Sequence, residues 1–193
     1  MPTSVEIGGV KYEIRSDYRA ALDIFAALAD PELTEQDKAV AMLTVFYPAF
    51  DGYTEEQDGE PVVVTMPPEH YEEATRRCAW FLDCGDEDQT RKLPKLMDWE
   101  QDFKHIVAPI NRVTGQEIRA VNYLHWWTFI AAYQEIGDCT FAQIVRIRDR
   151  KARGKPLDKQ DAEWYRQNRH LVDMKNQYTV QDDAVLSKWL GVK

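Results

Sequence analysis

Histidine and cysteine are the side chains that most often hold metals, and the sequence has four of the first and three of the second. The histidines are His70, His105, His125 and His170. They lie 20 or more residues apart, and none stands at ligand spacing from another histidine or from a cysteine. Cys78 and Cys84 are the nearest pair of cysteines, and no C-x-x-C occurs. The spacing therefore predicts no metal site.

The three cysteines, completed by Cys139, are an odd number, which does not suggest a disulfide framework. The first residues, Met1–Val10, lack the basic start and apolar core of a signal peptide. We therefore expect free thiols in a reducing cytoplasm.

Motifs of nucleophilic or nucleotide chemistry are also missing from the sequence. It contains no G-x-S-x-G, no G-x-x-x-x-G-K-[S/T] and no G-x-G-x-x-G. The acidic clusters Glu55–Glu56 and Asp86–Asp88 could imitate metal ligands, but solvated loop charge is the far more common use of such residues. We expect no catalytic residue and no cofactor, so the chain is predicted not to be an enzyme.

The strongest candidate for a binding surface is a basic run, 146–155, with six bases and one acid in a chain of net charge −9. Arg146, Arg150 and Arg153 share one helical face, and Arg148 and Lys151 lie on an adjoining one. The run could bind a partner, or it could be a solvated face paired with the protein's own carboxylates. The acidic net charge argues against a general nucleic-acid binder.

The second candidate is the segment Gln116–Gly137, which reads as one helix, apolar almost all round, with the pair Trp126–Trp127. Such a helix must be wrapped by protein or membrane. Its longest uncharged run, 120–134, is shorter than the ~20 apolar residues of a membrane span. We predict the central helix of a helical domain, capped by Thr114 with Glu117 and closed at Gly137. The two indoles could be core or a recognition surface.

The elements before this helix are predicted from local signals. Val5–Ile14 predicts a β-hairpin that turns at Gly8–Gly9. Helices are predicted over 17–29, with Ser16 as cap, and from Thr34 to the residues before Pro48. A further helix is predicted from Pro68 to about Cys84. The next is predicted from Asp98 to about Val107, because Pro109 follows and would interrupt it. The segment Phe50–Pro67 reads as a loop, with Val62–Val64 as a short strand or extended stretch.

After the tryptophans, a helix is expected from Thr140 with Phe141, Ile144, Val145 and Ile147 inward. Gly154–Pro156 breaks it, and polar helices are expected over 158–176 and 179–190. At 193 residues, with 44% hydrophobic and 30% charged side chains, the chain suits one globular domain with an appendage. The predicted fold is mostly α, with a helical domain over 1–154 and a C-terminal helical extension over 155–193.

A family resemblance rests on the tryptophan segment and on the helix predicted after it. Its carrying residues are Leu124, His125, Trp126, Trp127, Phe129 and Ile130, then Phe141, Ile144, Val145, Ile147 and Arg148. With the extended N-terminal segment and the helices, the chain resembles the bacteriophage "gene product fifteen" family. Those proteins come from tail-gene modules of long-tailed phages and prophages of Gram-positive bacteria.

The resemblance implies a role in tail assembly, in the host cell cytoplasm, with no catalytic motif. The implied role is that of a tail assembly chaperone that coats the tape-measure protein until tail-tube subunits displace it. The alternative is a structural protein of the tail kept in the virion, such as a tail-completion or baseplate component. The implied partners are the tape-measure protein and other tail proteins, with self-association left open and neither membrane nor nucleic acid expected.

Overall fold

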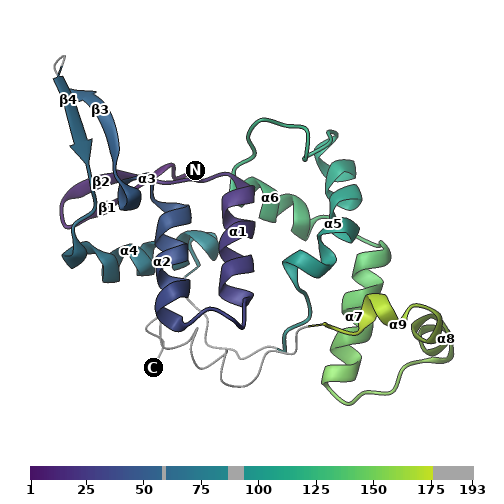
Figure 1. Cartoon of the computed structure of the whole chain (residues 1–193). Helices are drawn as coiled ribbons and strands as arrows, with labels where there is room; N and C mark the ends of the chain where they lie inside the picture. Colours follow the sequence, from purple (N-terminus) through teal and green to yellow (C-terminus); the bar gives the residue numbers. More distant parts are fainter. Residues whose placement is uncertain (58–59, 87–93, 176–193) are drawn as a thin grey trace. The chain divides into compact units, whose positions relative to one another are not determined.

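The computed structural model of the chain describes residues 1–57, 60–86 and 94–175, and its regular structure is mainly helical (Figure 1). The mostly α fold is therefore confirmed. The chain forms two compact units. Of the described residues, unit 1 holds 1–57, 60–86 and 123–127, and unit 2 holds 94–122 and 128–175. The expected extension from residue 155 stays a prediction; its residues 155–175 belong to unit 2, and the helix predicted over 179–190 lies outside the described residues.

Unit 1 begins with the predicted hairpin. Strands β1 (Ser4–Ile7) and β2 (Val10–Glu13) pair antiparallel, from Ser4 opposite Glu13 to Ile7 opposite Val10. The turn residues Gly8 and Gly9 have φ of 58° and 79°, the positive values that a two-residue turn of this kind needs at both positions. The hairpin contributes Val5, Ile7 and Tyr12 to the buried core.

Helices α1 (Tyr18–Ala29) and α2 (Glu35–Phe46) lie where they were predicted. The cap of α1 is Asp17 rather than Ser16, because the Asp17 carboxylate accepts the backbone N–H of Arg19. Thr34 and Asp37 form a complete capping box on α2. Pro48 ends that helix and also starts the short helix α3 (Pro48–Asp51).

The segment predicted as a loop over 50–67 is mainly a second hairpin, and the short strand expected at Val62–Val64 is part of it. Strands β3 (Tyr53–Gln57) and β4 (Glu60–Val64) pair antiparallel, and in Figure 1 they stand out from the helices of unit 1. The sequence holds a signal for it, since the Asp58–Gly59 pair between the two runs is typical of two-residue hairpin turns. A 3₁₀ turn (Pro68–His70) then leads into α4 (Tyr71–Leu82), as predicted for a helix from Pro68.

Unit 2 begins with α5 (Trp99–Thr114), which is longer than predicted. Asp98 caps it as expected, but the helix continues through Pro109 instead of ending at Val107. A proline inside a helix costs about 3 kcal/mol. The buried side chains on both sides of it, Ile106, Val107 and Ile110, offset that cost, and Gly115, left-handed with φ 70°, ends the helix.

The predicted continuous helix from Gln116 is wrong in its first half. Thr114 is the last residue of α5, and the next helix, α6 (Trp126–Gln134), begins at the first tryptophan. Glu117 caps nothing at Thr114; its carboxylate accepts bonds from Arg119 and Asn111. The backbone before α6 is held instead by a distant segment of the chain, because Tyr18 N–H donates to Leu124 O and Trp126 N–H donates to Ser16 O.

The remaining helices of unit 2 are α7 (Thr140–Ala152), α8 (Lys159–Gln167) and α9 (Arg169–Val172). Helix α7 begins as predicted, with Phe141, Ile144 and Ile147 buried and Val145 half-buried. The single polar helix expected over 158–176 is two helices that break at Asn168. In the three described stretches of the chain, no helix is both long enough and apolar enough to cross a membrane.

Candidate partner-binding residues

The tryptophan pair packs against the end of α4 in unit 1. The Trp126 indole N–H donates to Leu82 O at 2.8 Å, and that of Trp127 donates to Phe81 O at 2.9 Å. The last carbonyls of a helix have no partner within the helix. The two adjacent indoles therefore cap two consecutive carbonyls of α4.

Burial separates the two indoles and their neighbours. Trp126 is 1% exposed, whereas Trp127 is half-buried. The remaining residues of the predicted motif are mostly interior: Leu124, His125 and Phe129 are buried, and Ile130 is half-buried. Most of the motif therefore belongs to the core, and Trp126 offers no recognition surface.

His125 has both ring nitrogens engaged. Its Nδ1 accepts the backbone N–H of Trp127 at 3.0 Å, so that Nε2 carries the proton and donates to Pro2 O at 2.9 Å. The histidine joins the N-terminus of the chain to the start of α6. It has no free nitrogen with which to act as a general base.

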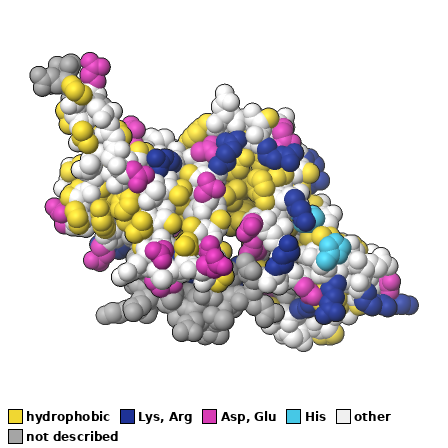
Figure 2. Space-filling view, in the orientation of Figure 1, with side chains coloured by type: hydrophobic (Ala, Val, Ile, Leu, Met, Phe, Trp, Pro, Cys, Tyr) yellow, Lys and Arg dark blue, Asp and Glu magenta, His cyan; other side chains and the backbone are white. Residues whose placement is uncertain are grey.

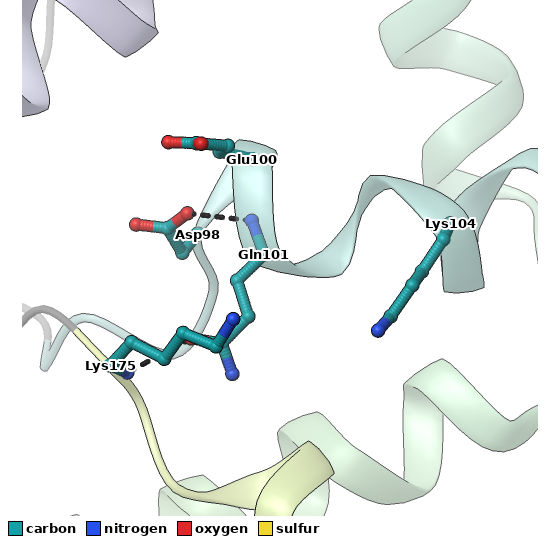
Figure 3. Close-up of a pocket in the computed structure, with 5 residues that line it drawn as sticks. All are labelled: Asp98, Glu100, Gln101, Lys104 and Lys175. Atoms are coloured by element: carbon teal, nitrogen blue, oxygen red, sulfur yellow. Dashed lines mark hydrogen bonds between the residues drawn. The ribbon is translucent and has the colours of Figure 1, made fainter.

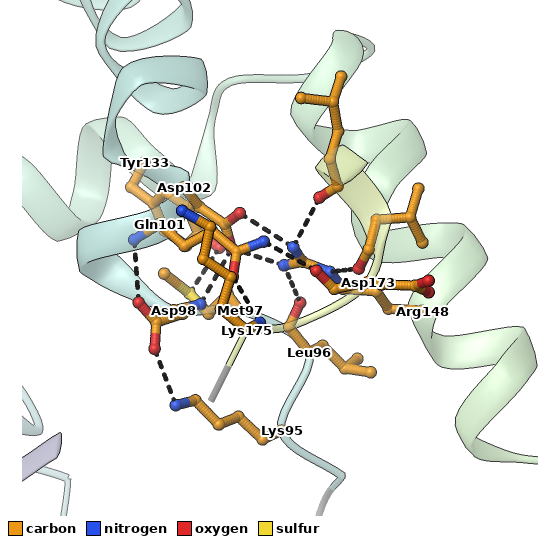
Figure 4. A network of polar contacts seen from close by, with 12 residues as sticks. Lys95, Leu96, Met97, Asp98, Gln101, Asp102, Tyr133, Arg148, Asp173 and Lys175 are labelled. Atoms are coloured by element: carbon orange, nitrogen blue, oxygen red, sulfur yellow. Dashed lines mark hydrogen bonds and ion pairs between the residues drawn. The ribbon is translucent and has the colours of Figure 1, made fainter. Parts of the chain in front are cut away.

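Arg148, predicted on a surface face, lies in the interior of unit 2 (Figure 4). Its guanidinium meets both carboxylate oxygens of Asp102, at 2.5 and 3.0 Å. The other guanidinium N–H groups donate to backbone carbonyls of Leu96, Leu171 and Val172. All five donors are thus used, and one side chain ties α5, α7, α9 and the segment before α5 together.

The expectation that Arg148 faces a partner is therefore corrected. Its buried position could have been read from the sequence. Arg148 stands four residues after Ile144 and seven after Phe141, on the same helical stripe as these buried side chains. Asp102 could not be picked out in the same way, because its partner is 46 residues away in sequence.

Four of the other five cations of the basic run have partners in unit 2. Arg146 pairs with the buried Asp161 at 2.7 Å, and Arg153 with Asp149 at 2.6 Å. Lys151 contacts Asp173 at 2.6 Å. Arg150 donates to Pro156 O at 2.8 Å. The arrangement matches the second interpretation of the run, a helix face paired with the protein's own carboxylates.

The charge is divided between the units. Residues 1–86 carry 18 acidic and 6 basic side chains, a net charge of −12, whereas residues 94–175 carry 11 acidic and 14 basic ones, a net charge of +3. Figure 2 shows acidic side chains over the helices of unit 1 and a group of Lys and Arg side chains over those of unit 2. Unit 1 is therefore the part of the chain that would attract a basic partner.

A pocket of about 330 Å³ lies at the start of α5, lined by Asp98, Glu100, Gln101, Lys104 and Lys175 (Figure 3). Gln101 is held within it, because its amide donates to Asp173 O and accepts the N–H of Lys175. The charges in this pocket have mixed signs, and Lys104 stands apart from the rest. The geometry offers no ligand set for a cation and no cluster of donors for an anion.

The cysteines and metal candidates add no further site. Cys78 is buried, which raises the pKa of its thiol, and burial also raises the pKa of Cys84 to about 11. Within the residues that the structure describes, no group of three or more His, Cys, Asp or Glu side chains is placed to hold a metal ion. The expected absence of a zinc site stays a prediction for the chain as a whole.

The sequence was compared with known proteins. Neither the comparison with curated proteins nor that with solved structures finds a match. The sequence model of one family, described as bacteriophage Gp15 protein, matches residues 1–174. That range covers most of both units and most of the chain, so the chain belongs to the bacteriophage Gp15 protein family.

Proposed function

We propose that the chain is a tail assembly chaperone, which binds the phage tape-measure protein and shields it in the host cytoplasm until the tail tube covers it. The observation that carries the proposal is membership of the Gp15 family along residues 1–174. The resemblance described from the sequence implies that proteins of this family come from tail-gene modules, beside the tape-measure gene. Under this proposal the chain acts by binding alone, without catalysis or a cofactor.

Physical chemistry supports such a role. A tape-measure protein is a long helical rod whose apolar stripes would aggregate before the tube encloses them. An acidic, mostly helical protein can cover such stripes through contacts between a helix and a groove. Weak contacts repeated along a rod give strong binding in total, yet each one remains easy to displace.

The basic face of α7 does not supply the contact surface in this account. Arg146 and Arg153 are paired with Asp161 and Asp149, and Arg148 is buried. Changing these residues to Glu would leave the buried Asp161 facing a like charge, and unit 2 would lose stability before binding could be measured. The contact surface is therefore sought in unit 1, where the acidic charge is concentrated.

Two measurements on the phage test the role and separate it from the alternative, a structural protein kept in the virion. The chain should co-purify with the tape-measure protein of its own tail module from infected cells. Mass spectrometry of purified virions should not find it. A stoichiometric amount in finished virions would favour the structural alternative, and a failure to co-purify would contradict the chaperone role.

A further inference from the structure

A shallow hollow of about 660 Å³ opens on unit 1, between the start of α1 and the end of α2. Its apolar wall comes from Ile14, Ala20 and Val45, with the ring of Tyr123 beside them. Asp17 lines it as well, and Asp23 and Asp51 are the two further acidic side chains that complete it. Both are exposed.

Tyr123 is the most informative residue of this hollow. Its side chain is 53% exposed, and among the residues that the structure describes it is the one aromatic that lies largely in solvent. Its hydroxyl is nevertheless fixed, since it lies 2.8 Å from Ser16 Oγ. A tyrosine held in place with its ring facing solvent loses little entropy on binding, and tyrosine is enriched among the residues that dominate interfaces.

The cations that line the hollow are engaged within unit 1. The Arg15 guanidinium donates to Thr44 O and Val45 O, at 2.6 and 3.0 Å, and so caps the end of α2. Arg19 pairs with Asp17 at 3.1 Å. In contrast, neither Asp23 nor Asp51 has an ion pair among the described residues. The charged side chains that line the hollow are two basic and three acidic, so its net charge is −1, of the same sign as that of unit 1 as a whole.

We infer that this hollow is the docking site for an amphipathic helix that carries Lys or Arg beside its apolar stripe. An apolar side chain of the helix would enter the space beside Tyr123, Ala20 and Val45. Its flanking cations would meet Asp23 and Asp51, which have opposite charge and no other ion pair among the described residues. The inference rests on the proposed function in one respect: the helix is taken to belong to the tape-measure protein.

Two independent variants test the site. Ala20→Trp fills the hollow from a half-buried position on α1, without removing a contact. Asp23→Lys with Asp51→Lys reverses the charge at two exposed positions, where the fold is little affected. The matched controls are Val40→Trp, on the exposed side of α2, and Glu6→Lys with Glu32→Lys, which changes the net charge by the same amount at exposed positions outside the hollow.

Binding of the full chain to immobilised full-length tape-measure protein is measured at low and high salt. The filling variant should bind at least about tenfold more weakly than the wild type, as expected when a central contact is lost. The charge reversal should slow association, and that effect should fade with salt. Both controls should bind like the wild type.

The outcomes separate the two ideas. If the wild type binds and both hollow variants bind equally well, the docking site is wrong while the chaperone role stands. If the wild type does not bind, the proposed function itself is contradicted. A wild-type dimer in sedimentation that Ala20→Trp dissociates would show that a second copy occupies the hollow, and that result would also overturn the inference.

Discussion

Arg148 on α7 and Asp102 on α5 form a buried ion pair joined by two hydrogen bonds, with the side chains 4% and 1% exposed. The Asp102 carboxylate also accepts the backbone N–H of Asp98, the residue that caps α5. The start of one helix, the middle of another and the carbonyls of α9 therefore depend on one charged pair.

Removing one member of this pair should be costly. Asp102→Ala is expected to lower the free energy of unfolding by about 3–5 kcal/mol, because the Arg148 charge is left buried without its partner. Arg148→Lys should also lower the free energy of unfolding, although the positive charge is kept, since an ammonium cannot supply five donors in a planar fork. Arg153→Met, at the exposed pair with Asp149, is the control and should cost less than about 1 kcal/mol. Urea denaturation followed by circular dichroism measures the stability of all three variants. Equal midpoints for the three would contradict the importance of the Arg148–Asp102 pair for unit 2.

The tryptophan pair should respond unequally to truncation. Trp126→Ala is expected to cost about 3–5 kcal/mol, because a fully buried indole is removed. Trp127→Ala should cost less, since Trp127 is half-buried and the carbonyl that it caps also accepts the Cys84 N–H. Thermal melting compares the two variants. If Trp127→Ala proved the more harmful, the order of burial would not explain the role of the pair.

Acid should weaken unit 2 in a defined range of pH. Burial alone would raise the pKa of Asp173, but hydrogen bonds from Lys151, Tyr165 and Arg169 lower it to about 2. The hydrogen bond from Arg146 likewise lowers the pKa of Asp161. An unfolded aspartate has a pKa of about 3.9, so these groups stabilise the fold fully above that pH. Their contribution should be lost as the pH falls from about 4 towards 2.

The measurement for this prediction is urea stability at a series of pH values from about 6 down to about 2, roughly the range in which carboxylates titrate. The slope below about pH 4 should be shallower in Asp173→Asn than in the wild type, because the variant lacks one of the titrating groups. Identical slopes would show that Asp173 titrates normally.

The two glycines of the first turn form a natural comparison. Both have positive φ, so an alanine at either should cost roughly 1 kcal/mol of backbone strain. A methyl group on Gly8 would also collide with the ring of His70, which Tyr12 holds by a 2.8 Å hydrogen bond, whereas nothing lies near Gly9. Gly8→Ala should therefore lower the melting temperature more than Gly9→Ala does. In a His70→Ala background the difference should shrink; if it persists, the collision is not its cause.

The thiols should be reduced and free of metal. At neutral pH, Cys78 should resist a thiol reagent because it is buried, and Cys84 should react slowly because its pKa is raised to about 11. In denaturant, Cys78, Cys84 and Cys139 should all react. Fewer than three reactive thiols in the denatured protein, or stoichiometric zinc by elemental analysis, would contradict the prediction.

Local signals predicted most of the elements. The Gly8–Gly9 pair indicated the first hairpin and its turn, and the Thr34 and Asp98 caps marked two helix starts. The errors arose where long-range contacts override local preference. Residues 116–125 do not form the predicted helix, because Asp17 and Ser16 accept the backbone N–H groups of Leu124 and of Trp126, the first residue of α6. No local pattern reveals partners more than a hundred residues away.

In the candidate sites, too, local patterns could be read from the sequence and long-range contacts could not. Helical spacing could have placed Arg148 on the buried stripe of α7, but it could not have named Asp102 as its partner. The hollow beside Tyr123 joins residues from the end of the first hairpin, α1, α2 and a segment about a hundred positions further on, so only the folded chain brings it together.

The most direct test of the chaperone account is the solubility of the tape-measure protein when the two proteins are co-expressed. After centrifugation, the account predicts that the tape-measure protein stays in the supernatant with the wild-type chain and pellets without it. The Val40→Trp variant should protect it as the wild type does, and Ala20→Trp should not. A tape-measure protein that is equally soluble without the chain, or that pellets in its presence, would contradict the account.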